Sequence, residues 1–463
     1  MSILETILAN LPEVEGPTQK KLSFKEKLKW TGIILVLFFV MGLIPLFGLG
    51  QNALAQFEYL SIILGASFGS IISLGIGPLV TSSIVLQLLN GSGMLKFDLT
   101  SPDGRKKFQG IQKILSVFFI IFEACIYVFM GGLAPAQELV GTSLYFQLEL
   151  LLVFQLFLGG IIIMLMDEVI SKWGFGSGIS LFIAAGVSQQ IFITGLSPFP
   201  SPANPGIATG ALPAFFQSLS AGDPTTAAIM FFTVFFTVVV FCMAVYAQAM
   251  KIEIPLSFGR VRGHGIRWPL NFMYTSNIPV ILVAALLANI QLWARLLQNW
   301  GWPILGTYVG NSPASGLVAW IAYPEIVRKI ITGSFASTDI LQTLTYIVIM
   351  MAGSLLFSWF WVQTSGMDAK SQAKQIMNSG LQMPGFRKDP RVLERVLDRY
   401  IKPLTVMGGL SVGFLAAIAD VTGALSRGTG ILLAVMIIYK LYEEIAKQHM
   451  MDMNPMMRKF MQV

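Results

Sequence analysis

Leu74-Gly75-Ile76-Gly77-Pro78 interrupts a hydrophobic run between residues 60 and 90. The run resumes as Leu79-Val80-Thr81-Ser82-Ser83-Ile84-Val85-Leu86-Gln87-Leu88-Leu89. Because two glycines lower helix propensity and Pro78 removes a backbone donor, this run cannot be one plain membrane helix. Irregular backbone at membrane depth is tolerated only where protein encloses it or where it lines a cavity. The sequence therefore predicts an enclosed pathway.

The composition is that of a membrane protein with many spans. The chain has 463 residues, of which 54% are hydrophobic and 12% charged, and its mean hydropathy is +0.70. The only cysteines are Cys125 and Cys242, and the only histidines are His264 and His449. A histidine-based metal site or catalytic triad inside the membrane is thereby excluded. A Gly-rich nucleotide-binding loop with its lysine does not occur either. We expect no enzyme activity, no metal and no cofactor, and any driving force must come from a partner.

Hydrophobic windows of about 20 residues predict ten membrane spans in an all-α polytopic fold. They lie near residues 29–47, 76–92, 111–130, 146–166, 178–194, 226–248, 278–296, 340–362, 404–422 and 429–446. With the N-terminus in the cytosol, 27 of the 31 basic residues fall on the cytosolic side. This distribution satisfies the positive-inside rule along the whole chain. We expect a multi-pass protein of the cell membrane with both termini in the cytosol.

Five spans in each half imply two halves of opposite orientation around a central pore, and the sequence contains weak echoes of such a repeat. The second span of each half starts with a proline, Pro78 or Pro279, and the fifth begins with glycines at 174–178 or 428–430. An inverted repeat places its site near the midplane where the halves meet. The expected parts are a cytosolic segment 1–27, an N-terminal half 28–193, an external hinge 194–223, a C-terminal half 224–447 with cytosolic loops 249–277 and 363–403, and a cytosolic tail 448–463.

The expected pathway has almost no ionisable residues. Ion-coupled transporters keep such groups in mid-membrane because these groups bind the coupling ion. Glu123 is the one clear mid-span carboxylate. It is either a hydrogen-bonded structural group or part of a polar cluster that lines an interface. Branched aliphatic residues instead stand next to the Gly and Pro breaks, as the pairs Ile76 with Val80 and Ile179 with Ile183. Ordinary core packing can explain such pairs, but a ring of stiff apolar side chains also makes a dewetted constriction.

Two long motifs resemble the SecY family of protein-conducting channels. The first is the interrupted stretch 74–89, and the second is Met166-Asp167-Glu168-Val169-Ile170-Ser171-Lys172-Trp173-Gly174-Phe175-Gly176-Ser177-Gly178-Ile179-Ser180-Leu181-Phe182-Ile183. Further similar stretches lie at 276–281, 380–387 and 428–433, so the resemblance extends from about residue 20 to 447. It implies a conduit for secretory and membrane proteins that also opens sideways into lipid, and it suggests an archaeal source.

The resemblance implies three groups of channel residues. The pore ring is Ile76, Val80, Ile179, Ile183, Ile281 and Leu432, with Leu433 as a competitor for the last place. The plug lies at about 62–72 and includes Ile62, Gly65, Ser67, Phe68, Gly69, Ile71 and Ile72. The lateral gate lies between spans two and three on one side and spans seven and eight on the other, and its polar residues are Thr81, Gln87, Glu123 and Asn289.

Basic residues are concentrated in the two large cytosolic loops. They are Lys251, Arg260, Arg262, Arg267, Arg387, Lys388, Arg391, Arg395 and Arg399. Topology alone can explain many of these charges. However, Arg391, Arg395 and Arg399 recur at every fourth position, which predicts one basic helical face suited to a phosphate backbone. In the family, these loops receive the ribosome or another cytosolic partner.

The family also implies partners that the sequence does not contain. These are a SecE-type single-span subunit that clamps the halves and a small third subunit, which together with this chain form a heterotrimer. Signal sequences, nascent polypeptides and membrane lipid are the remaining partners. The chief alternative function is a secondary transporter with broken helices, and a structural membrane scaffold is a third class. The sequence does not decide whether a ribosome or a motor supplies the driving force.

Overall fold

The structure is a computed structural model of the whole chain. It describes residues 12–18, 22–50, 69–91, 94–95, 97, 102–129, 133–200, 206–258, 265–275, 278–299, 301–309, 312–378, 381–382, 390–425 and 428–453. By contact density the chain divides into two compact units. Unit 1 comprises Met1–Leu86, Ser101–Phe231 and Lys440–Phe460, and unit 2 comprises Gln87–Thr100, Phe232–Tyr439 and Met461–Val463.

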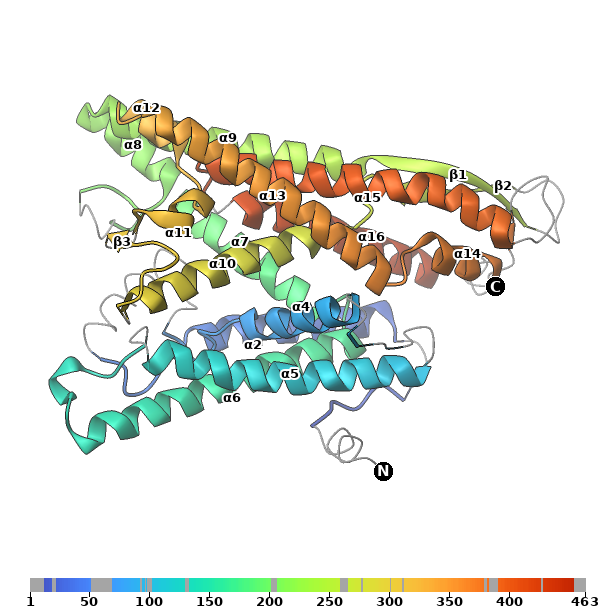
Figure 1. Cartoon of the computed structure of the whole chain (residues 1–463), viewed down its shortest axis with the longest axis horizontal. Coiled ribbons are helices and arrows are strands. Elements are labelled where there is room, and N and C mark those ends of the chain that lie inside the picture. The colour runs from blue at the N-terminus through green and yellow to red at the C-terminus, as the bar shows by residue number, and fades with distance from the viewer. Residues whose placement is uncertain are drawn as a thin grey trace. The chain divides into compact units, whose positions relative to one another are not determined.

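The fold is mostly helical (Figure 1). The helices in the first half of the chain are α2 (Phe24–Gly42), α4 (Gly77–Gly91), α5 (Pro102–Phe129), the short 3₁₀ helix η1 (Gln137–Leu139), α6 (Ser143–Trp173), α7 (Gly178–Leu196), α8 (Ala211–Ala221) and α9 (Pro224–Ala249). Those in the second half are α10 (Ile278–Asn299), α11 (Gly316–Ile321), α12 (Ile326–Ile331), α13 (Ser337–Thr364), α14 (Ala369–Asn378), α15 (Pro390–Val421) and α16 (Gly428–Met453).

Each of the ten predicted spans overlaps one helix, although the lengths differ. In the described part of the chain, six helical segments are long and apolar enough to cross a membrane: 106–129, 143–173, 178–196, 224–249, 337–377 and 391–421. Helix α4 is short, and α10 is apolar only over Ile278–Gln291. Helices α2 and α16 are long enough, but each has several charged residues at one end.

The all-α prediction is too strict, because two small sheets are present. Strands β1 (Lys251–Phe258), β2 (Gly265–Asn271) and β5 (Leu381–Gln382) form an antiparallel sheet in the order β2-β1-β5. Strands β3 (Tyr308–Val309) and β4 (Ser312–Pro313) form a second pair. The sequence of β1 alternates polar and apolar residues, which favours a half-buried strand over a helix. Within loop 249–277, strands β1 and β2 therefore pair as a hairpin.

Two helix boundaries differ from the predicted ones for local reasons. Helix α2 starts at Phe24 because Ser23 and Glu26 form a reciprocal capping box, in which each side chain accepts the other residue's backbone N–H at 3.3 Å. It ends at Gly42, ahead of Pro45. Helix α15 continues through Pro403, so the end of loop 363–403 and the ninth predicted span are one continuous helix. A proline inside a membrane helix is tolerated where neighbouring groups satisfy the freed backbone.

Unit 1 has two apolar cores that meet along α6. The first core combines Ile34 of α2, Ile163 and Ile170 of α6 and Phe182 of α7 with Ile72. The second core combines Leu152 and Leu156 of α6 with Ile120 and Val128 of α5 and with Leu74. The segment after α2 is attached to α6 because the Phe47 backbone exchanges two hydrogen bonds of 2.9 Å with the Gln155 side chain.

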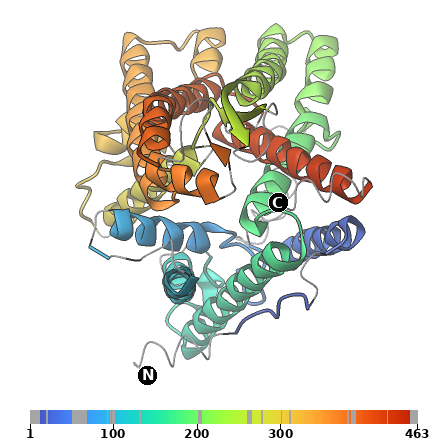
Figure 2. The same cartoon turned by 90° about the vertical axis from the view of Figure 1, so that its right-hand side faces the viewer.

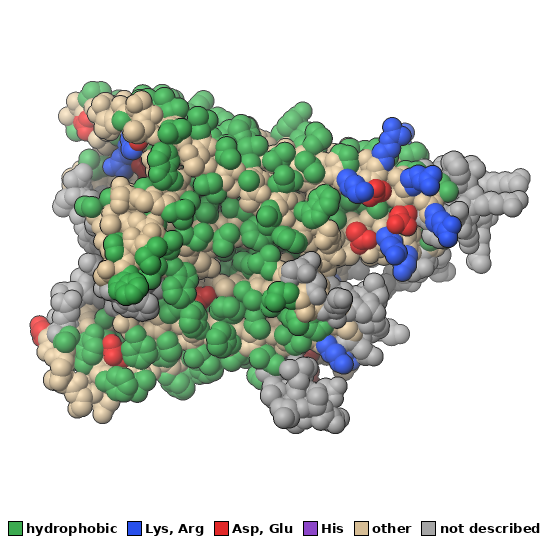
Figure 3. Space-filling view, viewed as in Figure 1, with side chains coloured by type: hydrophobic (Ala, Val, Ile, Leu, Met, Phe, Trp, Pro, Cys, Tyr) green, Lys and Arg blue, Asp and Glu red, His purple; other side chains and the backbone are tan. Residues whose placement is uncertain are grey.

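Unit 2 is organised around α13 and α15, which pack along each other (Figures 1 and 2). Small residues allow their close approach: Gly409 and Gly413 of α15 face Ser358 and Ser354 of α13. The buried Tyr346 hydroxyl donates to the Asp420 carboxylate at 2.7 Å, which adds a polar link between the two helices. In the view of Figure 3, most charged side chains of this unit lie at the end with β1, β2, α14 and the start of α15, a smaller group lies near α12, and the middle of the visible face is hydrophobic.

Candidate functional site

The predicted interruption of the hydrophobic run is confirmed. Residues 69–76 form successive turns, and the helix begins only at Gly77, with Pro78 in its first turn as predicted. Gly75 has a φ of +57°, a conformation that side chains with a Cβ rarely adopt. Ile72 before the break and Leu79 after it are buried in one core of unit 1, and Leu74 is buried in the other, so both sides of the break are fixed.

The four predicted ring residues of unit 1 lie at the starts of α4 and α7. Ile76 and Ile179 pack, partly buried, against the same core, which contains Leu79, Leu181 and Phe182. Val80 and Ile183 are also partly exposed. The structure thus brings together side chains that are about a hundred positions apart in the sequence and leaves part of each uncovered.

Asp167 and Thr31 position the start of α7, a role that was not predicted for either residue. The Ile179 N–H donates to Asp167 Oδ1 at 2.8 Å, and the Phe175 N–H donates to Thr31 Oγ1 at 3.1 Å. Such bonds satisfy backbone groups at a helix start that have no partner within the helix. The signal in the sequence was Asp167 itself, seven residues before the glycine-rich turn at 174–178 and twelve before Ile179.

The remaining predicted ring residues, Ile281 and Leu432 or Leu433, belong to unit 2. Ile281 is partly exposed on α10. Leu432 and Leu433 of α16 are 0% and 7% exposed, respectively, so burial does not separate these two candidates.

Two of the predicted gate residues are joined by a hydrogen bond. Thr81 Oγ1 lies 2.9 Å from the Gly77 carbonyl oxygen and 3.3 Å from Glu123 Oε1, and the two acceptors share its single proton. This contact links α4 to α5 within unit 1. Gln87 and Asn289 belong to unit 2, and each is half-buried on its helix.

A second polar link between α4 and α5 was not predicted from the sequence. The Ser82 and Ser116 hydroxyls lie 2.6 Å apart and are buried. One hydroxyl donates to the other across the two helices, and each oxygen also lies within hydrogen-bonding distance of a carbonyl of its own helix, at 2.8 Å from Leu79 and 2.9 Å from Gln112, respectively. Serines in apolar helices are common and have no distinctive spacing, so no local pattern distinguishes this pair.

The described part of the predicted plug is tied to the segment after α2. The Leu46 N–H donates to the Gly69 carbonyl and the Ile71 N–H to the Ile44 carbonyl, both at 2.9 Å. Ile72 is buried in the unit 1 core. The predicted plug residues Ile62, Gly65, Ser67 and Phe68 lie outside the described residues.

The predicted basic face of α15 is confirmed as a helical face. Arg391, Arg395 and Arg399 are all exposed on one continuous helix, whereas Leu393 and Leu397 on its other side are buried. Lys251 is exposed on β1 and lies over the Tyr439 ring at 6.0 Å, and Arg267 on β2 pairs with Glu253 at 2.9 Å. Arg260, Arg262, Arg387 and Lys388 lie outside the described residues.

The described parts of loops 249–277 and 363–403 share one sheet and one core, which the sequence did not predict. Ser257 of β1 pairs with Gln382 of β5. A single buried cluster contains Ile254 and Leu270 of the hairpin together with Leu393 and Leu397 of α15. The Tyr274 hydroxyl donates to the Met367 carbonyl at 2.6 Å, and burial, with a smaller effect of the Asp368 charge, raises the pKa of this hydroxyl. The described basic residues of both loops therefore lie on β1, β2 and α15, which share one buried core.

The chain was compared with known protein families and with related proteins. A family model described as SecY matches residues 70–442, and one described as the plug domain of Sec61p matches residues 36–69. Five predicted plug residues fall inside the second match, and Ile71 and Ile72 follow it. The protein translocase subunit SecY of Methanothermobacter thermautotrophicus is 43% identical over 461 residues, which cover 99% of this chain and 98% of the relative.

Two solved structures are also similar along nearly the whole chain. One is a SecY protein whose plug domain is described as stabilising the closed state of the translocation channel and maintaining a membrane seal; it is 42% identical, with a TM-score of 0.81 and 97% of each chain covered. The other is Sec61 in the canine ribosome-channel complex from the endoplasmic reticulum, which is 41% identical, with a TM-score of 0.78 and 97% of each chain covered. Since the SecY model covers most of the sequence and the relative aligns almost end to end, the chain belongs to the SecY family.

Proposed function

We propose that the chain is the central pore-forming subunit of a protein translocation channel. It moves unfolded secretory polypeptides across the membrane and releases transmembrane segments sideways into lipid through a lateral gate. One observation supports this proposal above the others. Ile76, within the broken backbone at 74–78, and Ile179, at the start of α7, pack against the same core. Family membership favours this channel over a secondary transporter.

The proposed architecture has ten spans in two inverted five-helix halves, 28–193 and 224–447, joined by the external hinge 194–223. Both termini lie in the cytosol. The ten helices that overlap the predicted spans support the count, and the biased distribution of basic residues supports the orientation.

The proposed seal is an apolar ring of Ile76, Val80, Ile179, Ile183, Ile281 and Leu432 or Leu433, with the plug at about 62–72 beside it. Apolar contact is non-directional, so such a ring closes around any extended chain without reading its sequence. A narrow apolar constriction also excludes water and ions when no chain occupies it. The solved relative whose plug is described as maintaining a membrane seal supports the role of the plug.

The proposed lateral gate is held shut by weak polar contacts that involve Thr81, Gln87, Glu123 and Asn289. The Thr81–Glu123 hydrogen bond supports this assignment on the side of unit 1. Hydrogen bonds between membrane helices contribute about 0.6 to 2 kcal/mol each, so an inserting apolar signal sequence can displace them.

The proposed cytosolic partner is the ribosome, which binds the basic residues of loops 249–277 and 363–403. The exposed arginines of α15 support this, as does the similarity to Sec61 in a ribosome-channel complex. Their proposed ligand is the phosphate backbone of ribosomal RNA. A SecE-type single-span subunit and a small third subunit complete the proposed heterotrimer.

Crosslinking of a stalled secretory chain tests the pore assignment. Cysteines are placed one at a time at Ile76, Ile179 and Ile281, in a background where Cys125 and Cys242 are replaced by serine. Phe154 of α6, which is 55% exposed and belongs to neither core of unit 1, provides the control position. We expect adducts between the stalled chain and all three ring positions and none at Phe154. Labelling confined to other helices would refute the assignment.

A further inference from the structure

The N-terminal leader, described over residues 12–18, lies along the end of α6. These residues form neither helix nor strand, and Pro12 and Pro17 favour an extended backbone. An extended segment of this kind satisfies few of its own backbone N–H and C=O groups, so these groups need partners elsewhere. The partners are side chains at the C-terminal end of α6, within residues 168–173.

Three side chains of α6 bind the backbone of the leader. The Lys172 ammonium donates to the Val14 carbonyl, and the Val14 N–H donates to the Glu168 carboxylate. The Trp173 Nε1–H donates to the Glu15 carbonyl at 2.9 Å. Both main-chain polar groups of Val14 and one of the following residue are thus paired with α6.

The side chains of the leader contribute less to this contact. Glu13 pairs with Lys172 at 2.6 Å, but the Glu13 side chain is 69% exposed. Ion pairs that are open to solvent contribute little to stability. Glu15 and Gly16 are exposed as well. Since every residue except proline has the backbone groups that α6 binds, the contact requires an extended chain and not a particular sequence.

The binding groups of α6 are held in place by contacts that do not involve the leader. Glu168 contacts both Lys113 of α5 and Lys172 at 3.0 Å. The Trp173 ring packs on Trp30 of α2, with 5.5 Å between the ring centroids. If the leader leaves, the Glu168 carboxylate therefore keeps two cationic partners, and no buried charge is left unpaired. A site that stays preorganised in this way can exchange one extended segment for another at low cost.

We propose that Glu168, Lys172 and Trp173 form a clamp for an extended polypeptide backbone. The leader occupies this clamp in the idle channel, and an unfolded secretory chain replaces it on entry. The clamp rests on the proposed translocation function. Trp173 is followed directly by the turn 174–178, which leads to Ile179 of the proposed ring. A folded protein has few unpaired backbone groups to offer, and a phosphate backbone offers no N–H to Glu168.

Crosslinking of a stalled secretory chain to the full chain, purified with the subunits that accompany it, tests the clamp. A cysteine replaces Ser171, an exposed residue next to the clamp, in the background without Cys125 and Cys242. A cysteine at Ile76 reports on the pore in a parallel sample. We expect adducts at both positions. Adducts at Ile76 with none at Ser171 would overturn the clamp alone, whereas their absence at Ile76 would count against the proposed function.

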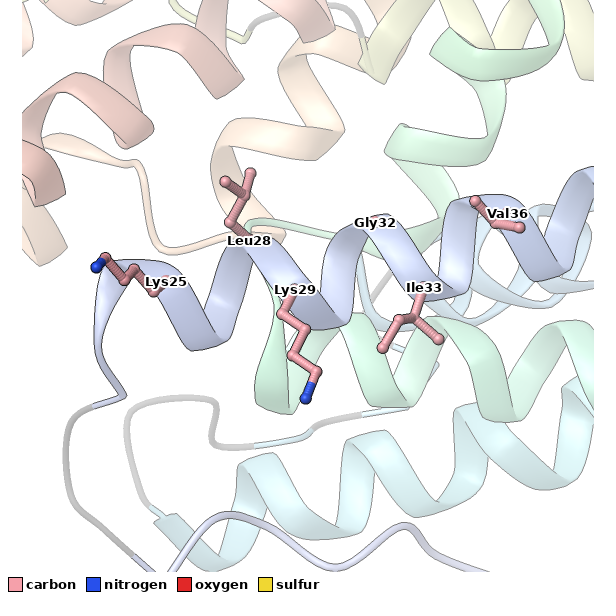
Figure 4. A pocket seen from close by; sticks show the side chains of 6 residues that line it. All are labelled: Lys25, Leu28, Lys29, Gly32, Ile33 and Val36. Carbon is pink, nitrogen blue, oxygen red and sulfur yellow. The ribbon is translucent and has the colours of Figure 1, made fainter.

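Removal of the donors of α6 tests which groups hold the chain. Lys172→Met with Trp173→Phe keeps the bulk of both side chains and removes both donors. The adduct at residue 171 should fall about ten- to twentyfold, since each hydrogen bond contributes about a factor of three to five. Lys25→Met with Lys29→Met is the matched control. It removes two exposed lysines from an open groove of about 530 Å³ on α2 (Figure 4) and should leave the adduct unchanged. Equal losses in both variants would contradict the clamp.

A change in the leader tests the competition. Val14→Pro removes the N–H that binds Glu168 and leaves α6 unaltered. The adduct of the stalled chain at residue 171 should then rise about threefold or more, after division by the reactivity of the same cysteine with a small maleimide. Gly16→Ala changes an exposed leader residue that has open space around it and should have no effect. An unchanged normalised yield for Val14→Pro would show that the leader is a fixed structural contact and would overturn the proposal.

Discussion

Because Gly159 has no side chain, the backbone just before the broken span approaches α6 closely. A Cβ at this position of α6 would collide with the carbonyl oxygen of Ile71, just before the turns that lead to Gly75. The next residue, Gly160, faces Ile120 of α5 at similarly short range. Because protein interiors are close-packed, backbone this near tolerates no added atom without a shift. The break at 74–78 therefore depends on α6 as much as on its own glycines.

Replacing Gly159 by alanine should destabilise the protein. We expect a loss of about 1 to 3 kcal/mol, the usual range for overpacking, which exceeds the gain of up to about 1 kcal/mol from the better helix propensity of alanine. Thermal unfolding in detergent measures the effect. Gly186→Ala in α7 is the matched control, because a Cβ there meets nothing within 4 Å. Equal unfolding temperatures for the two variants would contradict this role of Gly159.

Among the structural elements, α15 connects the membrane-spanning part of unit 2 to its basic surface. It runs without interruption from Pro390 to Val421, and its first two turns bury Leu393 and Leu397 against the hairpin of β1 and β2. Arg391, Arg395 and Arg399 project from the exposed side. A rigid helix thus holds three guanidinium groups in a row, and the sheet that joins both loops keeps that row fixed relative to Lys251 and Arg267.

Reversing charge on this face should weaken ribosome binding. For Arg391→Glu with Arg395→Glu we expect a lower affinity and a shallower dependence of log affinity on log salt, by about 0.7 to 0.9 for each phosphate that is no longer neutralised. A salt titration of ribosome binding measures both. Lys370→Glu with Lys374→Glu on α14 makes the same charge change four positions apart at a site not assigned to the ribosome. An unchanged slope for the arginine variant, or an equal change for the lysine variant, would count against the assignment.

Local signals predicted the helices well and the tertiary links poorly. The period of four residues in 391–399 was visible in the sequence, and so were the proline and glycines that break the run before α4. The pairing of β1 with β5 was not visible, because β5 has only two residues and lies more than a hundred positions from its partner. The same holds for Ser82 with Ser116 and for Asp167 with Ile179, whose contacts depend on how helices pack. The all-α prediction was too strict because it assigned no strands to loop 249–277, where β1 and β2 pair.

For the molecule as a whole, the distribution of basic residues predicts which loops face the cytosol, and labelling can test this orientation. Basic residues concentrate in the leader, the loops after even-numbered predicted spans and the tail. We expect a cysteine at Lys374 in α14 to react with a membrane-impermeant maleimide only from the cytosolic side, and a cysteine at Ser220 in α8 only from the outside. Labelling of intact and permeabilised cells distinguishes the two. Reaction of both positions from the same side would contradict the proposed ten-span topology.

The proposed uncharged apolar ring seals the channel at rest and yields to an unfolded chain. Ion conductance of the channel in a lipid bilayer measures this seal, with Ile76→Lys and Ile179→Lys compared with the apolar controls Ile76→Leu and Ile179→Leu. A charged side chain should hydrate the constriction, so we predict a clear rise in resting conductance for each lysine variant and none for the leucine variants. Resting conductance that stays at the level of the unmodified protein in both lysine variants would contradict the claim.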